Sequence, residues 1–135
     1  NINDGNVVVE LSSSKTKKSV EIVNNKPKFK IEINCDGSIA EVASNIKVEE
    51  TESIELIKKQ SEEEIKRIVN EAINYSKEIK TDIFSLGSLV YKKDHKLWKN
   101  IKENWENELN NLEIEIKVNL NLKTKGSIDN IIEGR

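Results

Sequence analysis

The last third of the chain carries the clearest alternation of apolar and polar residues. Over residues 113–122 every second side chain is apolar: Ile114, Ile116, Val118, Leu120 and Leu122. Because successive side chains of a strand point to opposite faces, this pattern predicts a β-strand with one buried and one solvated face. We expect the strand to end near Gly126, and residues 128–132 to form a short strand or tail.

The first fifty residues show the same alternation. Phe29, Ile31, Ile33 and Cys35 share one face of a predicted strand. Asp36-Gly37 follows, a dipeptide typical of hairpin turns, so a turn is predicted there and a further strand over residues 39–43. Shorter strands are expected at residues 7–11 and 20–23, with the polar run 12–18 as a loop or solvated strand edge. Pro27, which lacks an amide hydrogen, is placed at a strand start.

The middle of the chain reads as helical. From Ser53, apolar or small residues recur every three or four positions: Ile54, Ile57, Ser61, Ile65, Ile68, Ala72, Tyr75 and Ile79. No glycine or proline interrupts residues 53–80, so one long amphipathic helix is predicted. Residues 81–91 form an apolar, non-periodic break. A second helix is expected from Asp94, its N-cap, with one apolar stripe: Trp98, Ile101, Trp105, Leu109 and Leu112.

These elements together predict an α+β fold. Strands that alternate along their whole length suit an antiparallel sheet, because parallel strands are covered on both faces and read as continuous apolar runs. The two amphipathic helices, one of them long, are expected to pack on the apolar face. We expect a single domain over residues 1–131. Residues 132–135 spell Ile-Glu-Gly-Arg, a protease site often added by engineering, and are kept outside it.

Composition narrows the possible functions. The formal net charge of −2 supplies no basic excess for phosphate contacts, so a nucleic-acid partner is not expected. Cys35 is the single cysteine and His95 the single histidine, which leaves neither a disulfide nor a Cys/His metal site. No apolar run is long enough to span a membrane and no signal peptide is visible, so we expect a soluble stretch. The absence of methionine suggests that it derives from a longer chain.

Catalytic residues are not apparent. Cys35 lies on the inward phase of a strand, which is typical of a small buried side chain, and His95 lies beside a helix cap, where exposure is expected. No glycine-rich phosphate loop is present. The interpretation is a non-enzymatic domain without catalytic residues, metal or cofactor. The lysines at positions 92, 93, 96 and 99 are interpreted as a solvated face, with contact to anionic lipid or a partner as the alternative.

An ordered set of features covers residues 54–126. A long helix of mixed charge leads to Asp82-Ile83-Phe84-Ser85-Leu86-Gly87, followed by Val90-Tyr91-Lys92-Lys93, by Trp98 and Trp105, and by the alternating strand. This set resembles the C-terminal domain of the spore germinant-receptor C subunits, the Ger(x)C or GerAC-like lipoproteins of endospore-forming bacteria. The corresponding family segment is Asp-Ile-Phe-Gly-Phe-Gly. Ser85 therefore stands where that family has glycine and Leu86 where it has an aromatic residue, which predicts a stiffer loop.

The resemblance implies a function outside catalysis. It implies the C-terminal domain of a longer lipoprotein, held at the outer face of the spore inner membrane by an N-terminal lipid anchor absent from this sequence. Cys35, inside a predicted strand, is not the lipid-bearing cysteine. The implied partners are the polytopic A subunit and the membrane B subunit of a nutrient germinant receptor. A scaffold or interaction domain is the first hypothesis, and a nutrient-binding module with a pocket between helices and sheet is the alternative.

Five residues are structural or interface candidates: Asp82, Phe84, Gly87, Trp98 and Trp105. Asp82 is expected to cap the turn after the long helix by accepting backbone N–H bonds. Gly87 is expected at a positive φ or at a close approach of the backbone. The two tryptophans are expected to pack the second helix against the sheet, and the nutrient-binding alternative places its ligand beside them.

Overall fold

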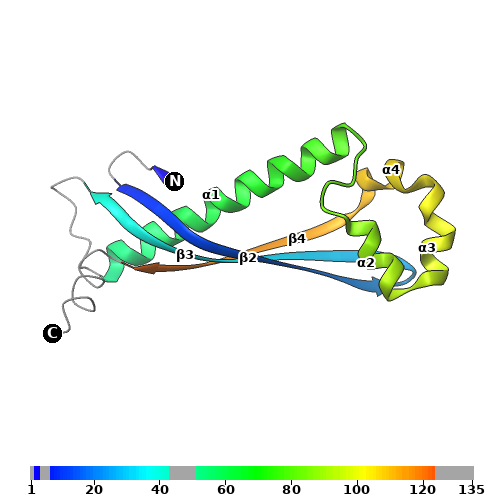
Figure 1. Cartoon of the computed structure of the whole chain (residues 1–135), viewed down its shortest axis with the longest axis horizontal. Coiled ribbons are helices and arrows are strands. Elements are labelled where there is room, and N and C mark those ends of the chain that lie inside the picture. The colour runs from blue at the N-terminus through cyan, green and yellow to red at the C-terminus, as the bar shows by residue number, and fades with distance from the viewer. Residues whose placement is uncertain (1, 4–6, 43–50, 124–135) are drawn as a thin grey trace. The chain divides into compact units, whose positions relative to one another are not determined.

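A computed structural model describes residues 2–3, 7–42 and 51–123. The elements in chain order are β1 (Ile2–Asn3), β2 (Val7–Val23), β3 (Lys26–Val42), α1 (Thr51–Glu78), α2 (Leu86–Lys93), α3 (His95–Ile101), η1 (Lys102–Asn104), α4 (Trp105–Glu108), η2 (Leu109–Asn111) and β4 (Glu113–Lys123) (Figure 1). The α+β class is confirmed. The expected end of the last strand at Gly126 and the site at residues 132–135 lie outside the described residues.

The chain divides into two compact units. The first comprises Asn1–Lys15, Ile33–Lys66 and Val118–Arg135, and the second comprises Thr16–Glu32 and Arg67–Lys117. Strands β2, β3 and β4 and helix α1 each contribute residues to both units. The single domain over residues 1–131 stays a prediction, and the two units are described separately below.

The hairpin turn lies earlier than predicted. β2 and β3 are joined at Asn24 and Asn25, whose φ angles of 53° and 62° are those of a type I′ turn. The turn predicted at Asp36-Gly37 is wrong, because both residues lie inside β3. A side chain at Gly37 would place its Cβ 3.1 Å from the backbone oxygen of Glu10, so glycine serves close packing there. Asparagine tolerates the left-handed region well enough to replace glycine in the turn.

The sheet has the order β1-β2-β3-β4 and mixed strand directions. β1 pairs antiparallel with β2, while β3 and β4 run the same way (Figure 1). The pairs Asn34–Asn119 and Asp36–Asn121 advance together along β3 and β4, as parallel strands require. The helices between β3 and β4 supply the crossover. The predicted antiparallel pairing holds for β1 with β2 and is wrong for β3 with β4, because alternation indicates a solvated face and does not determine strand direction.

The predicted inward face of β3 is confirmed. In β3 the buried side chains are Phe29, Ile31, Ile33, Cys35 and Ile39. In β4, Ile116 and Leu120 are buried, while Ile114, Val118 and Leu122 are half-buried. Leu120 of β4 is 2% exposed. The polar run 12–18 belongs to β2 and is mostly exposed. Of the two predictions for this run, the solvated strand edge is confirmed and the loop is wrong.

Helix α1 forms over almost the predicted range, but its buried face drifts. Ile57, Ser61 and Ile65 are buried as predicted in the first unit. In the part of α1 that belongs to the second unit, the buried residues are Ile73 and Ser76. The predicted burial of Ile68, Tyr75 and Ile79 is wrong, because their exposed fractions are 50%, 57% and 42%. The predicted positions stay on one side of the helix, whereas the buried residues Ile57, Ser61, Ile65 and Ile73 follow one another at multiples of four residues. Because a helix has 3.6 residues per turn, steps of four move the buried face gradually around the helix axis.

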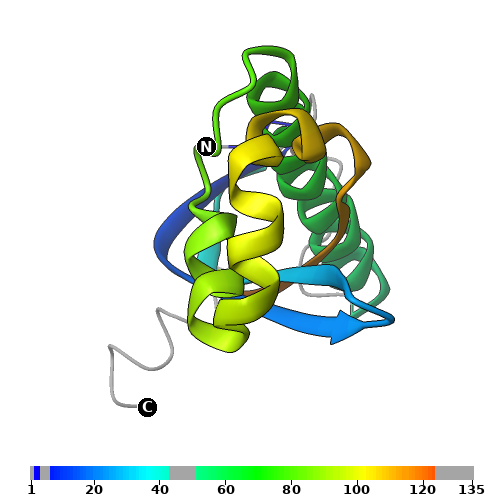
Figure 2. The same ribbon diagram turned by 90° about the vertical axis from the view of Figure 1, so that its right-hand side faces the viewer.

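The second unit holds the remaining helices. α2 occupies most of the segment predicted as a non-periodic break, and the predicted second helix is a broken series from α3 to η2. Asp94 caps α3, since its Oδ1 accepts the N–H of Leu97 at 3.0 Å. Figure 2 shows α2 and α3, light green and yellow, side by side. A core forms within this unit from Phe29, Leu86, Val90, Leu97, Trp105 and Leu109.

None of the helices in the described ranges is both long and apolar enough to cross a lipid bilayer.

Candidate functional site

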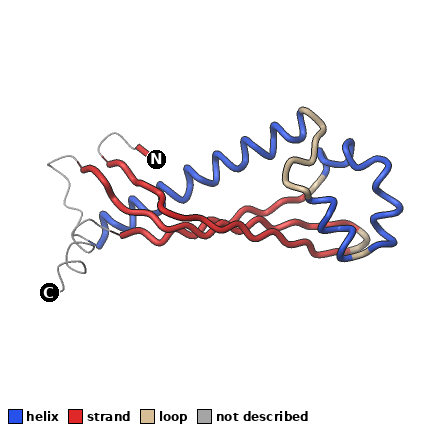
Figure 3. The backbone as a smooth tube through the Cα atoms, viewed as in Figure 1, coloured by secondary structure: helices blue, strands red, loops and turns tan. Residues whose placement is uncertain are grey.

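The loop between α1 and α2 begins with a tight helix ending (Figure 3). Lys80 adopts φ 53°, its N–H bonds the Lys77 carbonyl at 3.2 Å, and the Thr81 N–H bonds the Ser76 carbonyl at 3.0 Å. These are the two bonds of a Schellman motif, with lysine at the position that usually holds glycine. The buried Ser76 hydroxyl donates to the Thr81 carbonyl and accepts the N–H of Ile83. The chain is thereby held in place just before Asp82.

The Asp82 carboxylate gathers three donors. Its Oδ1 accepts the N–H of Leu86 at 2.8 Å, and its Oδ2 accepts the N–H of Gly87 at 2.8 Å. Oδ2 also accepts the indole Nε1–H of Trp105 at 2.9 Å. Ser85, which stands at the formal N-cap of α2, makes no side-chain capping bond. Asp82 therefore caps α2 and ties its start to α4, and a negative charge is favourable at that end of a helix.

Gly87 lies where two tryptophans meet. The rings of Trp98 and Trp105 are 5.3 Å apart and inclined by 73°, an edge-to-face pair. A Cβ built on Gly87 would lie 2.7 Å from Cη2 of Trp98 and 3.0 Å from Nε1 of Trp105. Of the two roles expected for Gly87, the structure shows the close approach, and its φ lies outside the left-handed region. Trp105 also meets Phe29 of β3 edge to face, with ring centres 6.3 Å apart.

Ser85, like Lys80 before it, bears backbone strain. Its φ of 56° and ψ of 40° lie in the left-handed region, which side chains other than glycine and asparagine rarely adopt. The next residue, Leu86, is buried in the core of the second unit. Phe84 packs against the same core, and its carbonyl accepts the Lys18 ammonium at 2.6 Å. The loop is thus bonded to β2 as well as to α2 and α4.

All five residues singled out from the sequence lie around the start of α2 in the second unit. Asp82, Gly87, Trp98 and Trp105 form a continuous chain of contacts, and Phe84 packs against the cluster that contains Trp105. Sequence reasoning missed Lys18, which was assigned to a polar run, and Ser76, whose burial follows only from the drift of the α1 face. Lys18 lies 66 residues from Phe84 in the chain, and no sequence signal indicates their contact.

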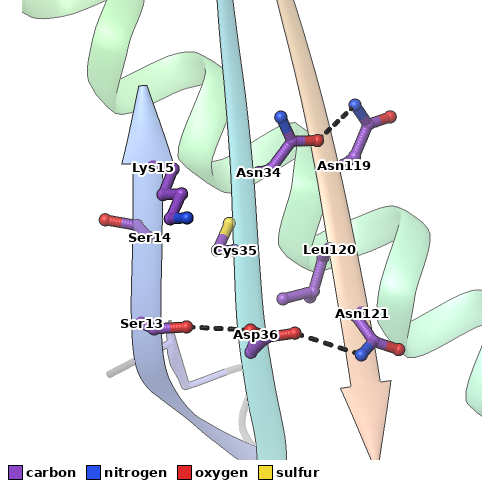
Figure 4. Close-up of a pocket in the computed structure, with 9 residues that line it drawn as sticks. All are labelled: Ser13, Ser14, Lys15, Asn34, Cys35, Asp36, Asn119, Leu120 and Asn121. Atoms are coloured by element: carbon purple, nitrogen blue, oxygen red, sulfur yellow. Dashed lines mark hydrogen bonds between the residues drawn. The ribbon is translucent and has the colours of Figure 1, made fainter. Parts of the chain in front are cut away.

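The first unit has a pocket of about 450 Å³ on its sheet (Figure 4). It is lined by Ser13, Ser14, Lys15, Asn34, Cys35, Asp36, Asn119, Leu120 and Asn121. Asp36 accepts bonds from Ser13 at 2.8 Å and from Asn121 at 3.0 Å. These two hydrogen bonds hold the pKa of Asp36 below its ordinary value, and the bond from Ser13 contributes more than the bond from Asn121. These polar side chains bond one another across β2, β3 and β4, and their geometry supports strand register.

Cys35 and His95 have the environments expected from the sequence. Cys35 is buried. Desolvation raises the pKa of its thiol, and the negative charges of Glu62 and Asp36 raise that pKa further, so the nucleophilic thiolate is disfavoured. The Glu62 carboxylate accepts the backbone N–H of Leu120 at 2.8 Å. His95 is exposed and its ring stacks on Tyr91, with centres 4.5 Å apart.

The comparison with known proteins agrees with this arrangement. The family model described as "Spore germination B3/ GerAC like, C-terminal", a C-terminal domain of spore germination proteins, matches residues 1–126 of the chain. The chain belongs to this family, that of the germinant-receptor C subunits.

Two relatives illustrate the match. The chain is 22% identical over 128 residues to spore germination protein KC of Bacillus subtilis (strain 168). The aligned region covers 94% of the chain and 31% of that protein. The crystal structure of the GerBC protein matches with a TM-score of 0.74 and 21% identity, over 90% of the chain and 39% of the solved one. The second likeness shows a shared fold. The chain spans about a third of the length of these relatives.

Replacing Ser85 by glycine is expected to stabilise the protein. Glycine removes a left-handed penalty of about 1–2 kcal/mol, and its greater freedom in the unfolded chain offsets part of that gain. We expect the free energy of unfolding in urea to rise by about 0.5–1 kcal/mol. The matched control is Ser88→Gly, an exposed position inside α2, which is expected to lower it by a similar amount. Equal losses for both variants would contradict the assigned strain.

Replacing Gly87 by alanine is expected to destabilise the protein, although alanine is the better helix former. The added Cβ meets Trp98 and Trp105 at the distances given above, and overpacking of this kind costs about 1–3 kcal/mol. Urea unfolding measures the loss, with Ser88→Ala as the control in the same helix. In a Trp98→Phe background the cost is expected to shrink, because the smaller ring leaves room. A stabilised Gly87→Ala variant would show that the close approach is absent.

Proposed function

We propose that this chain is a non-enzymatic scaffold or interaction domain of a nutrient germinant receptor. Its partners would be the receptor's A and B subunits, and the full-length protein would be lipid-anchored at the outer face of the spore inner membrane. Membership of the C-subunit family supports this proposal. The observation that carries it is an exposed apolar surface on α1, because protein–protein contacts are the usual use of such a surface.

That surface, the α1 stripe, consists of Ile68, Tyr75, Ile79 and Ile83 in the second unit. Their exposed fractions are 50%, 57%, 42% and 47%. Spacings of seven and four residues put the first three on one side of α1, and Ile83 follows in the adjoining loop. Large apolar side chains gain free energy when a partner covers them. Three such residues on one side of the helix, with a fourth in the adjoining loop, therefore suit a contact surface better than scattered exposed residues would.

The charges beside the α1 stripe describe the partner's chemistry. Glu71 and Glu78 are exposed and follow one another at seven residues, so they line one side of the stripe. Arg67 donates to Glu71 at 2.5 Å. A partner segment with an apolar stripe bordered by lysine or arginine would match this surface in both shape and charge.

The nutrient-binding alternative is less well supported by the same geometry. Its ligand was expected beside Trp98 and Trp105, where the two rings pack against each other and against Gly87. Trp105 is 7% exposed and its indole N–H is bonded to Asp82. A ligand there would have to displace packed rings and a charge-assisted hydrogen bond, which costs free energy.

The proposal is tested in spores with the full-length protein. The variant Ile68→Asp/Tyr75→Asp places charge on the α1 stripe. Leu56→Asp is the matched control, because Leu56 is 57% exposed on the same helix and lies outside the stripe, in the first unit. Recovery of the C subunit with a tagged A subunit is expected to fall at least about 30-fold for the first variant, as for loss of an interface hot spot. The control is expected to co-purify normally, and nutrient germination should follow recovery.

The outcome that contradicts the proposal is equal recovery of both variants and the wild type, once circular dichroism shows that all are folded. A saturable change of tryptophan fluorescence with amino acids or sugars, lost in Trp98→Phe, would instead support the nutrient-binding alternative.

A further inference from the structure

The helices α2 and α3 concentrate positive charge. Between residues 91 and 102 the chain has five lysines and one aspartate, a net of +4 in a protein whose formal net charge is −2. All five lysines are exposed, and they form what we call the α2–α3 basic surface: Lys92, Lys93, Lys96, Lys99 and Lys102. The aspartate, Asp94, is engaged in capping α3. The surface lies entirely within the second unit.

These lysines have no partner in the described part of the chain. The ion pairs found there, Lys28–Glu113 and Arg67–Glu71, involve other residues. Lys92 and Lys93 lie in the last turn of α2, where a cation suits the helix dipole. Lys96 lies in the first turn of α3, where a cation is unfavourable. Helix stability therefore does not account for the whole cluster.

An aromatic side chain accompanies the charges. Tyr91 is 50% exposed, and its ring lies nearly flat on His95, with an interplanar angle of 12°. Tyrosine combines an apolar ring with a polar tip, which suits the boundary between lipid headgroups and acyl chains. Lysines with long apolar stems around such a ring are typical of surfaces that lie on a membrane.

We propose that the α2–α3 basic surface binds the headgroups of an anionic lipid bilayer. The five lysines carry point charges and lack the bidentate fork of arginine, which is rare throughout this chain. A bilayer presents a broad sheet of negative charge that point charges match without fixed geometry. An acidic protein would be expected to use more specific pairing. This contact requires no receptor subunit, so it stands independently of the proposed function.

Co-sedimentation with lipid vesicles tests the proposal on the 135-residue chain. One vesicle contains phosphatidylglycerol and phosphatidylcholine in equal parts, and the other contains phosphatidylcholine alone. We expect binding to the first only, weakened by high salt. Lys92→Glu/Lys96→Glu is expected to lower the affinity at least about 30-fold, taking one lysine near an anionic surface as a factor of about five.

A charge-matched variant controls for net charge. Lys59→Glu/Lys117→Glu reverses two exposed lysines outside the surface and is expected to lower the affinity less than about threefold. Equal losses in both variants, or equal binding to both vesicles, would overturn the proposal. So would displacement of the chain from vesicles by polyglutamate or single-stranded DNA at equal charge concentration, because the surface would then prefer an acidic polymer. Circular dichroism of every variant excludes unfolding as the cause.

Discussion

The Asp82 carboxylate is the contact on which the rest of the second unit depends. It accepts the N–H groups of Leu86 and Gly87 and the indole N–H of Trp105. An eight-residue helix such as α2 is not stable alone, so a tertiary contact must hold its first turn. Ser76 and the Schellman ending of α1 in turn hold the chain before Asp82. One side chain thereby connects the end of α1, the start of α2 and α4.

The second unit carries two exposed surfaces suited to contact. The α1 stripe is apolar with glutamates beside it, and the α2–α3 basic surface is cationic with one exposed tyrosine. Gly87 and the two tryptophans pack against each other inside this unit, and both carboxylate oxygens of Asp82 accept hydrogen bonds from backbone or indole N–H groups. The Asp82 carboxylate is thus engaged in holding structure. The proposed contacts with protein and with lipid rest on the two exposed surfaces.

Much of this arrangement is predictable from local patterns, and the rest depends on distant contacts. Alternation in β3 and β4 correctly predicted their buried faces, and Asp94 was recognisable as a cap. The direction of the strands could not be predicted in this way. Burial of one face is compatible with parallel and with antiparallel strands once helices supply a crossover. The turn was assigned to Asp36-Gly37 because a glycine is the stronger signal for a hairpin turn. Asn24-Asn25 forms the turn instead, since asparagine can also adopt the positive φ angles that such a turn requires. The role of Gly87 depends on where Trp98 folds back, which no local pattern contains.

A double-mutant cycle between Asp82 and Trp105, read by urea unfolding, tests the central claim most directly. Asp82→Asn is expected to lower the free energy of unfolding by about 2–4 kcal/mol, since an amide cannot accept all three bonds. In the double variant Asp82→Asn/Trp105→Phe, the loss of unfolding free energy should be smaller than the sum of the losses in the two single variants by about 1 kcal/mol or more. Asp94→Asn, a cap that asparagine serves equally well, should change it by less than about 0.5 kcal/mol. Additive losses, or an Asp82→Asn cost no greater than that of Asp94→Asn, would contradict the account.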